Sequence, residues 1–180
     1  MKKKLKIGLL LDDLKLNELN QEIIHHIIEK NICEKFFIIR QNIPRRTLFF
    51  YLKKYTILRI IDKVFIKLIF LVEKFIISKF FETKYLFNKI DIRMLIEEVI
   101  NVKPVISESG YFYDFLNEDI ERIKNKNLDV ILRLGSGIIR GEMLNASKNG
   151  IFSFHHGDNL LFRGGPPGFW EVYFSKPLTG

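Results

Sequence analysis

The first 40 residues alternate between short apolar runs and a longer segment with helical spacing. Residues 5–11 form an apolar run behind several lysines, and residues 35–40 (KFFIIR) form a second. Between them, residues 16–31 carry one apolar stripe made of Leu16, Leu19, Ile23, Ile24, Ile27 and Ile28. A strand, a crossover helix and a second strand favour a parallel sheet with helices on its faces.

The same rhythm returns in the second half of the chain. Residues 129–134 (DVILRL) are nearly all apolar, which is typical of a central parallel strand. Further strands are predicted at 103–107 and 150–156, and helices at 114–127, about 141–147 and 169–173. The predicted fold class is α/β: an open, mostly parallel sheet with helices on both faces, in a single domain spanning residues 1–180.

Residues 47–81 interrupt this rhythm with a segment dense in Ile, Phe, Leu and Lys. Within this segment the longest uncharged run after Tyr55 is 68–72, far below the roughly 20 residues of a membrane span. Regular charges predict one or two amphipathic helices, and a further helix is predicted at 92–100, so that 47–100 is a helical insertion. Two interpretations of 47–81 stay open: helices packed on the domain, or a basic amphipathic segment that contacts a membrane or a partner.

The formal net charge is +8, and the lysines that dominate it are found along the whole chain. A lysine-rich surface explains this charge, as does attraction to an anionic partner, but no nucleic-acid-binding motif accompanies it. Cys33 is the single cysteine, which excludes an intrachain disulfide and fits a cytoplasmic location, with peripheral membrane contact as the alternative. The apolar run near the N-terminus is too short for a secretion signal. The sequence indicates no oligomeric state.

Unusual residues follow two of the predicted strands. Ligands bind beyond the carboxyl ends of strands in open α/β sheets, so we expect residues 134–137 (LGSG) and 155–159 (HHGDN) to face one crevice. Gly135 and Gly137 permit a close approach of a ligand to the backbone. The chain has neither G-x-G-x-x-G after its first strand nor G-x-x-x-x-G-K-[ST], so dinucleotide and P-loop sites are not predicted.

The histidine pair is separated by strand geometry. Along a strand at 150–156, Ser153 and His155 share one face, whereas His156 points to the other. The two histidines therefore do not readily bind one metal, and without a Cys pair or H-E-x-x-H no metal site is predicted. A Ser153–His155–Asp158 triad is disfavoured because no G-x-S-x-G turn is present.

Residues 129–180 resemble the amino-terminal domain of the folate-dependent formyltransferases, which act on methionyl-tRNA, phosphoribosylglycinamide and amino sugars. The resemblance rests on DVILRLGSGII and on NGIFSFHHGDNLLFRGGPPGFW, with matching spacings at Gly150, His155, Arg163, Gly164, Pro167 and Trp170. It implies transfer of a formyl group from 10-formyltetrahydrofolate to the amine of a small substrate, with a sugar or nucleotide-linked amine favoured over methionyl-tRNA. In that case His155 would polarise the formyl carbonyl or stabilise the oxyanion, and the backbone of Leu134, Gly135, Gly137 and Ile138 would contact folate.

The chain departs from the family pattern in three places. Ser153 stands where the family has Asn, residues 157–161 (GDNLL) replace its S-x-L-P loop, and its Asp would fall beyond Gly180. We therefore expect a chain truncated relative to the family, with an incomplete catalytic set. The alternatives are a catalytically incomplete binding module, associated with membranes through residues 47–81, and a nucleotide-sugar enzyme built on a similar sheet.

Overall fold

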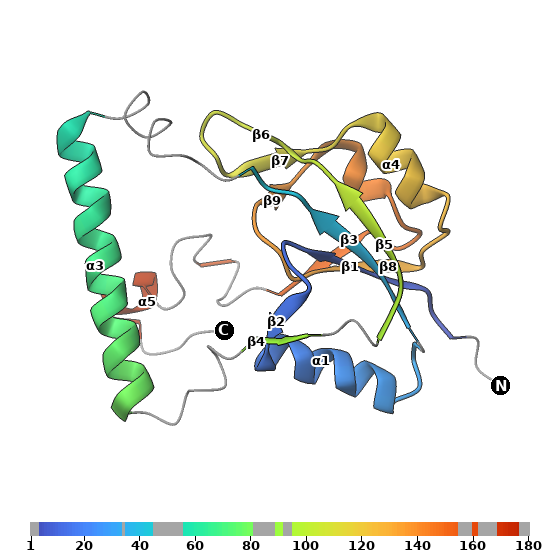
Figure 1. Cartoon of the computed structure of the whole chain (residues 1–180), viewed down its shortest axis with the longest axis horizontal. Coiled ribbons are helices and arrows are strands. Elements are labelled where there is room, and N and C mark those ends of the chain that lie inside the picture. Colours follow the sequence, from blue (N-terminus) through green and yellow to red (C-terminus); the bar gives the residue numbers. More distant parts are fainter. Residues whose placement is uncertain are drawn as a thin grey trace.

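The structure, a computed structural model, describes residues 4–33, 35–44, 56–80, 89–91, 95–154, 160–161 and 169–176. Its centre is a five-stranded parallel sheet in the order β10-β8-β1-β3-β5 (Figure 1). The strands are β1 (Ile7–Leu11), β3 (Phe36–Gln41), β5 (Ile96–Val102), β8 (Val130–Arg133) and β10 (Ile151–Ser153). The chain builds the sheet outward from β1 on one side, then returns to β1 and builds outward on the other, as in Rossmann-like folds. The α/β class and the parallel sheet predicted from the sequence are confirmed.

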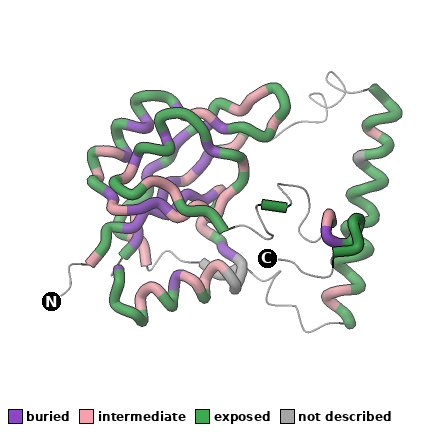
Figure 2. The backbone as a smooth tube through the Cα atoms, turned by 180° about the vertical axis from the view of Figure 1, so that it is seen from behind, coloured by how far each residue is buried: buried purple, intermediate pink, exposed green. Residues whose placement is uncertain are grey.

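Side-chain alternation along the strands gives the sheet two apolar faces. Leu9, Leu11 and Ile38 belong to one buried cluster, which includes Ile24 of the helix α1 (Glu18–Glu29). The opposite face carries a second cluster, which the helix α4 (Asn117–Lys124) covers with Ile120 and Ile123. Burying one such aliphatic side chain stabilises the fold by about 1.5–3 kcal/mol. Because the side chains of each strand alternate between the two faces, both faces are apolar and each is covered by a helix. Figure 2 shows the buried residues concentrated in this part of the molecule.

Two smaller sheets flank the main one. β2 (Lys15–Asn17) pairs antiparallel with β4 (Lys89–Asp91), and β6 (Val105–Ile106), β7 (Phe112–Asp114) and β9 (Ile138–Ile139) form a three-stranded sheet. Asp114, at the end of β7, accepts hydrogen bonds from Arg140 Nε at 3.0 and 2.8 Å and from its terminal nitrogen at 2.6 Å. The chain then forms a short 3₁₀ helix (Gly141–Asn145), and α5 (Phe169–Tyr173) follows later.

The helix predicted at 92–100 is wrong, because Ile96–Val102 is the strand β5. Leu95, Ile96, Val99 and Ile100 recur at a spacing that a helix would also give. The strand lacks the expected alternation because its register with β3 shifts between Phe36 and Phe37, and an inserted residue of this kind breaks the period of two. Pairing with β3 therefore decided the structure of a segment whose own pattern was ambiguous.

Other predicted elements change their limits or their partners. Residues 103–107 contribute Val105–Ile106 to the small sheet and not to the main one, because they pair with β7. The helix predicted at 114–127 begins only at Asn117, since Phe112–Asp114 is a strand. The first helix is likewise shortened, because Lys15–Asn17 pairs with β4 before α1 begins.

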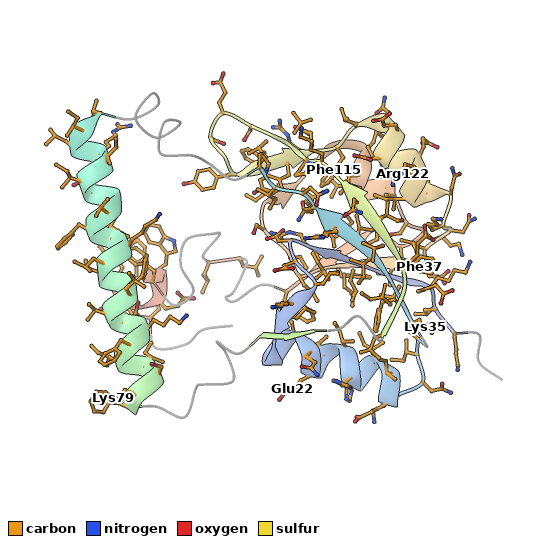
Figure 3. All side chains as sticks on the ribbon, viewed as in Figure 1. Glu22, Lys35, Phe37, Lys79, Phe115 and Arg122 are labelled. Atoms are coloured by element: carbon orange, nitrogen blue, oxygen red, sulfur yellow. The ribbon has the colours of Figure 1, made fainter. Side chains whose placement is uncertain are left out.

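The segment predicted to be amphipathic contains one long helix, α3 (Ile57–Phe80, 24 residues). The rest of that prediction, residues 47–55 and 81, lies outside the described residues. Most of the α3 side chains are exposed, and they project around the helix in Figure 3, with Lys79 near its end. Among the helices that the structure describes, none is both long enough and apolar enough to cross a membrane.

Candidate functional site

The main sheet has one point where the strand order reverses, between β1 and β8. From there the chain runs to β3 and β5 on one side and to β10 on the other, and open α/β sheets bind their ligands beyond the carboxyl ends of the strands at such a point. Asp12 directly follows β1, and residues 134–137 directly follow β8. The loop singled out from the sequence therefore lies where this fold class binds its ligands.

Asp12 fastens this loop to the end of β1. Its carboxylate accepts hydrogen bonds from the Ser136 N–H at 3.1 and 3.0 Å and also from the Ser136 hydroxyl. Gln41, at the end of β3 and 1% exposed, donates from Nε2 to Asp12 Oδ1 at 3.1 Å and to the Ser136 carbonyl at 3.3 Å. These three residues, here named the strand-end clasp, connect the ends of three neighbouring strands.

The clasp explains why residue 135 is a glycine. A Cβ atom there would lie 2.8 Å from Asp12 Oδ1, 2.8 Å from Gln41 Nε2 and 3.2 Å from the Leu10 carbonyl oxygen. Gly137 has φ +81° and faces the Tyr113 ring, so a side chain is excluded there by conformation and by space. Both glycines are thus required by packing inside the protein, in addition to any role in binding.

Several backbone N–H groups of residues 134–138 are hydrogen-bonded within the protein. The Leu134 N–H donates to the Leu10 carbonyl at 3.1 Å, and the Ile138 N–H donates to the Tyr111 carbonyl at 2.7 Å. The Ser136 N–H is held by Asp12. Within the described part of the chain, the N–H groups of Gly135 and Gly137 have no such partner, so they are the donors of this loop that a ligand can use.

Arg133 connects β8 to β10 on the same edge of the sheet. It is in register with Ser153, the last residue of β10, and donates from its terminal nitrogen to Ser153 Oγ at 2.7 Å. Burial lowers the pKa of Arg133, and the nearby Asp12 carboxylate opposes that shift. The guanidinium stays charged because arginine is not deprotonated in proteins. Its Nε is buried and has no hydrogen-bond partner among the described residues.

Ser153 and the glycine loop are therefore brought to one edge of the sheet. His155 and His156 lie outside the described residues, as do Arg163, Gly164 and Pro167. Ser153 is exposed, and its hydroxyl also lies 3.4 Å from the Phe154 carbonyl oxygen. Of the predicted site residues, Leu134, Gly135 and Gly137 lie in the loop that follows the neighbouring strand β8, and Ile138 begins β9.

Sequence reasoning missed Asp12, Gln41 and Arg133. In the sequence Asp12 directly follows the first apolar run, and Gln41 lies just past the predicted second strand. The available signal was polarity at strand ends: Arg133 is a charged residue inside the apolar run DVILRL, and Asp12 follows the first strand of an α/β fold. Each such residue required a partner that only the tertiary structure supplies.

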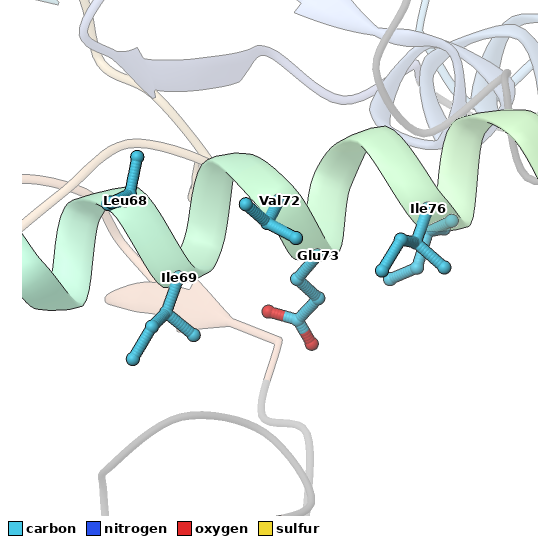
Figure 4. A pocket seen from close by; sticks show the side chains of 6 residues that line it. Leu68, Ile69, Val72, Glu73 and Ile76 are labelled. Atoms are coloured by element: carbon cyan, nitrogen blue, oxygen red, sulfur yellow. The ribbon is translucent and has the colours of Figure 1, made fainter.

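A separate apolar hollow of about 460 Å³ lies on α3 (Figure 4). It is lined by Leu68, Ile69, Val72, Glu73, Ile76 and Ile77, with Glu73 as its one charged group. None of these residues belongs to the strand-end clasp. Across the part of the chain that the structure describes, no three His, Cys, Asp or Glu side chains are grouped so as to hold a metal ion.

Comparisons with models of protein families, with curated proteins and with solved structures each find no match for this chain.

Proposed function

We propose that this chain transfers a formyl group from 10-formyltetrahydrofolate to the amine of a small substrate. The observation that supports this most directly is the 2.7 Å hydrogen bond from Arg133 to Ser153. It joins the last residue of β8, which precedes the glycine loop in the sequence, to the last residue of β10, two positions before His155, at the carboxyl edge of the sheet. Ligand sites of open α/β sheets lie at that edge.

In the proposed reaction the amine nitrogen attacks the formyl carbon, and the carbonyl oxygen becomes an oxyanion. The bond between the formyl carbon and N10 of the folate then breaks, and the proton released by the amine passes to N10. The products are a formamide and tetrahydrofolate. Groups that stabilise the oxyanion lower the barrier to the attack, and hydrogen-bond donors held in place beforehand do this best.

His155 and Ser153 are the proposed catalytic residues. The imidazole of His155 donates to the oxyanion, and the Ser153 hydroxyl supplies one further donor where the formyltransferases have an amide. Because Arg133 donates to Ser153 Oγ, the Ser153 oxygen is already an acceptor, and its own proton is a stronger donor in such a chain. Arg133 is thus a positioning residue that also adds positive charge near the developing oxyanion.

On the folate side, the N–H groups of Gly135 and Gly137 are the proposed donors to the cofactor. The strand-end clasp keeps the loop in a single conformation by engaging the Ser136 N–H and carbonyl. A loop ordered before binding loses less conformational entropy when the ligand arrives. Disrupting Asp12 should therefore weaken folate binding even though Asp12 does not contact the cofactor.

The proposal is tested by calorimetric titration of the full chain with 5-formyltetrahydrofolate, a stable formyl folate, and in parallel with UDP-glucose. We expect binding of the folate alone, with the binding lost in Gly135→Val. Binding of UDP-glucose without folate would favour a nucleotide-sugar enzyme and overturn the proposal, as would binding of neither ligand.

Transfer itself is measured with 10-formyltetrahydrofolate and hydroxylamine as a small nucleophile. His155→Ala should slow transfer about 100-fold or more, as the loss of an oxyanion donor does. His156→Ala is the neighbouring control and should leave the rate unchanged, because the resemblance assigns the oxyanion role to His155 alone. Folate binding with no transfer by the unaltered chain would favour the binding-module alternative.

A further inference from the structure

The helix α3 exposes more apolar surface than a helix packed in a domain does. Fourteen of its large apolar side chains are exposed, among them Val64 at 62%, Phe65 at 61% and Phe75 at 62%. A surface helix normally turns its apolar stripe toward a core, and a large contiguous apolar patch in solvent marks an interaction site. This surface is separate from the strand-end clasp, and the inference from it does not depend on the proposal of formyl transfer.

The apolar side chains of α3 are gathered on one side. At 100° per residue, an arc of about 160° around the helix contains only large apolar residues, apart from Lys79 in the last turn. Phe65, Leu68 and Val72 lie near the middle of this arc. The Lys79 ammonium lies 5.8 and 5.7 Å from the ring centroids of Phe75 and Phe80.

The opposite side of the helix carries most of its charges. Arg59, Lys67 and Lys74 lie there and are exposed, whereas Asp62 and Glu73 lie toward one margin of the apolar arc. An apolar face backed by basic residues is the pattern of helices that lie in the plane of a membrane surface. Such helices bury the apolar face at the level of the lipid headgroups and leave the lysines among anionic groups and water.

The net positive charge of the chain is concentrated in the segment that contains α3. Residues 45–84 contain ten Lys and Arg against three Asp and Glu, a net charge of +7 out of the +8 of the whole chain. The remaining 140 residues are close to neutral, with a net charge of +1, because their lysines and arginines are nearly balanced by acidic residues. The helix α3 itself contains five of these basic residues and two acidic ones, a net charge of +3, so excess positive charge and the apolar surface exposed among the described residues lie in the same part of the sequence.

We propose that α3 lies flat on an anionic lipid surface and attaches the α/β domain to it. A membrane with anionic lipids offers both properties that this helix requires, an apolar layer and a negative surface potential that attracts polybasic segments. A second copy of the chain would offer the apolar surface but would bring a segment of the same positive charge. Charge complementarity therefore selects the lipid surface over self-association.

Flotation of the full chain with vesicles tests this directly. We expect the protein to float with phosphatidylcholine vesicles that contain phosphatidylserine and to stay behind with pure phosphatidylcholine. High salt should weaken the binding, because the attraction between lysine and lipid is screened over about 10 Å. No flotation with the anionic vesicles, in low salt, would overturn the proposal.

Two phenylalanines distinguish the contribution of the apolar arc to lipid binding from that of the rest of α3. Phe65 lies in the arc at 61% exposure, and Phe70 lies on the charged side at 53%. Phe65→Ser should lower the partition coefficient about tenfold to a hundredfold, the cost of losing one buried aromatic side chain. Phe70→Ser makes the same chemical change and should leave binding nearly unaltered. Equal effects of the two substitutions would overturn the orientation and hence the proposal.

The basic contribution is tested with the triple variant Arg59→Gln, Lys67→Gln and Lys74→Gln. At about fivefold for each basic residue near the surface, its binding should fall roughly 100-fold. Its control carries the same number of substitutions at exposed lysines elsewhere, Lys15→Gln, Lys30→Gln and Lys103→Gln, and should bind like the unaltered chain. Equal losses in the two triple variants would contradict a specific role for α3.

Sedimentation and circular dichroism complete the test. All these substitutions are at exposed positions, so the far-ultraviolet spectrum of each variant should match that of the unaltered chain. A dimer that forms in the absence of vesicles and is abolished by Phe65→Ser, together with failure to float, would assign the surface to a second copy and overturn the proposal.

Discussion

The sheet and α3 are built from the same kinds of residues, but they use them in opposite ways. Leu9, Leu10 and Ile38 in the sheet are 0% exposed, whereas Leu58, Ile61 and Leu68 on α3 are 56–74% exposed. The difference arises from what covers each surface. Neighbouring strands and the helices α1 and α4 cover the strands of the sheet, whereas the described residues leave the apolar arc of α3 exposed. The apolar content of this chain is therefore divided between a part that stabilises the fold and a part that is available for contact.

The largest expected effect compares two leucines. Leu10→Ala removes a fully buried side chain from the central strand and should lower the free energy of unfolding by about 2–5 kcal/mol. Leu68→Ala on α3 should change it by less than about 0.5 kcal/mol, because that side chain is 56% exposed. Urea denaturation in the absence of lipid measures both. A similar loss in the two variants would mean that α3 is packed against the domain in solution.

The second prediction concerns the polar contacts of the sheet. Gly135→Ala places a Cβ 2.8 Å from two atoms of the strand-end clasp and should lower the free energy of unfolding by about 1–3 kcal/mol. In an Asp12→Ala background the same substitution should cost less, because one of the crowded atoms is gone. Denaturation of the two single variants and the double variant measures this. If the losses in free energy of unfolding of the two single variants add strictly in the double variant, the clasp is not the reason that residue 135 is a glycine.

The third prediction compares an arginine that is hydrogen-bonded within the sheet with an exposed arginine on α3. Arg133→Gln loses the hydrogen bond to Ser153 and should lower the free energy of unfolding by about 1.5–3 kcal/mol, at the lower end because Arg133 is only half-buried. Arg59→Gln on α3 is the matched control and should change stability by less than about 0.5 kcal/mol. A double-mutant cycle with Ser153→Ala measures the coupling. Without coupling, Arg133 would not position Ser153.

The smallest expected effect on stability comes from the interaction between Asp114 and Arg140, at the edge of the domain. The hydrogen bond from Arg140, opposed by some desolvation and assisted by its charge, lowers the pKa of the Asp114 carboxyl. A carboxyl with a lowered pKa stabilises the fold above its ordinary pKa, and that stabilisation disappears as the pH falls through the folded value. Carboxyl NMR titration should show the lowered pKa and its return toward the ordinary value in Arg140→Gln. An identical titration curve in the variant would remove Arg140 as the cause.

The sequence predicts the parts of the fold that are determined locally. The strands β1, β3 and β8 are short apolar runs bounded by polar residues, and α1 and α3 carry long periodic stripes. The strand β5 was missed because its spacing suits a helix as well, and pairing with β3 settles it. The three-stranded sheet was missed since strands of two or three residues leave almost no periodicity.

The candidate site was predicted in outline and not in mechanism. Residues 134–137 were identified from their glycines, but the clasp that holds them joins Asp12 to Ser136, 124 positions apart. No local pattern relates two residues at that separation, so the polar network could be found only in the folded chain. The role expected for His155 stays a prediction, which the transfer assay tests.

The late position of β8 in the sequence has a consequence for the order in which the chain folds. The strand β1 can pair with β3 as soon as the first 41 residues exist, but its other edge stays open until β8 has been made. Contacts between distant residues are slow to form, because the intervening chain must first be brought together. During synthesis, the whole of α3 leaves the ribosome while the central strand still lacks one neighbour. If α3 binds lipid as proposed, it becomes available for that binding before the sheet is complete.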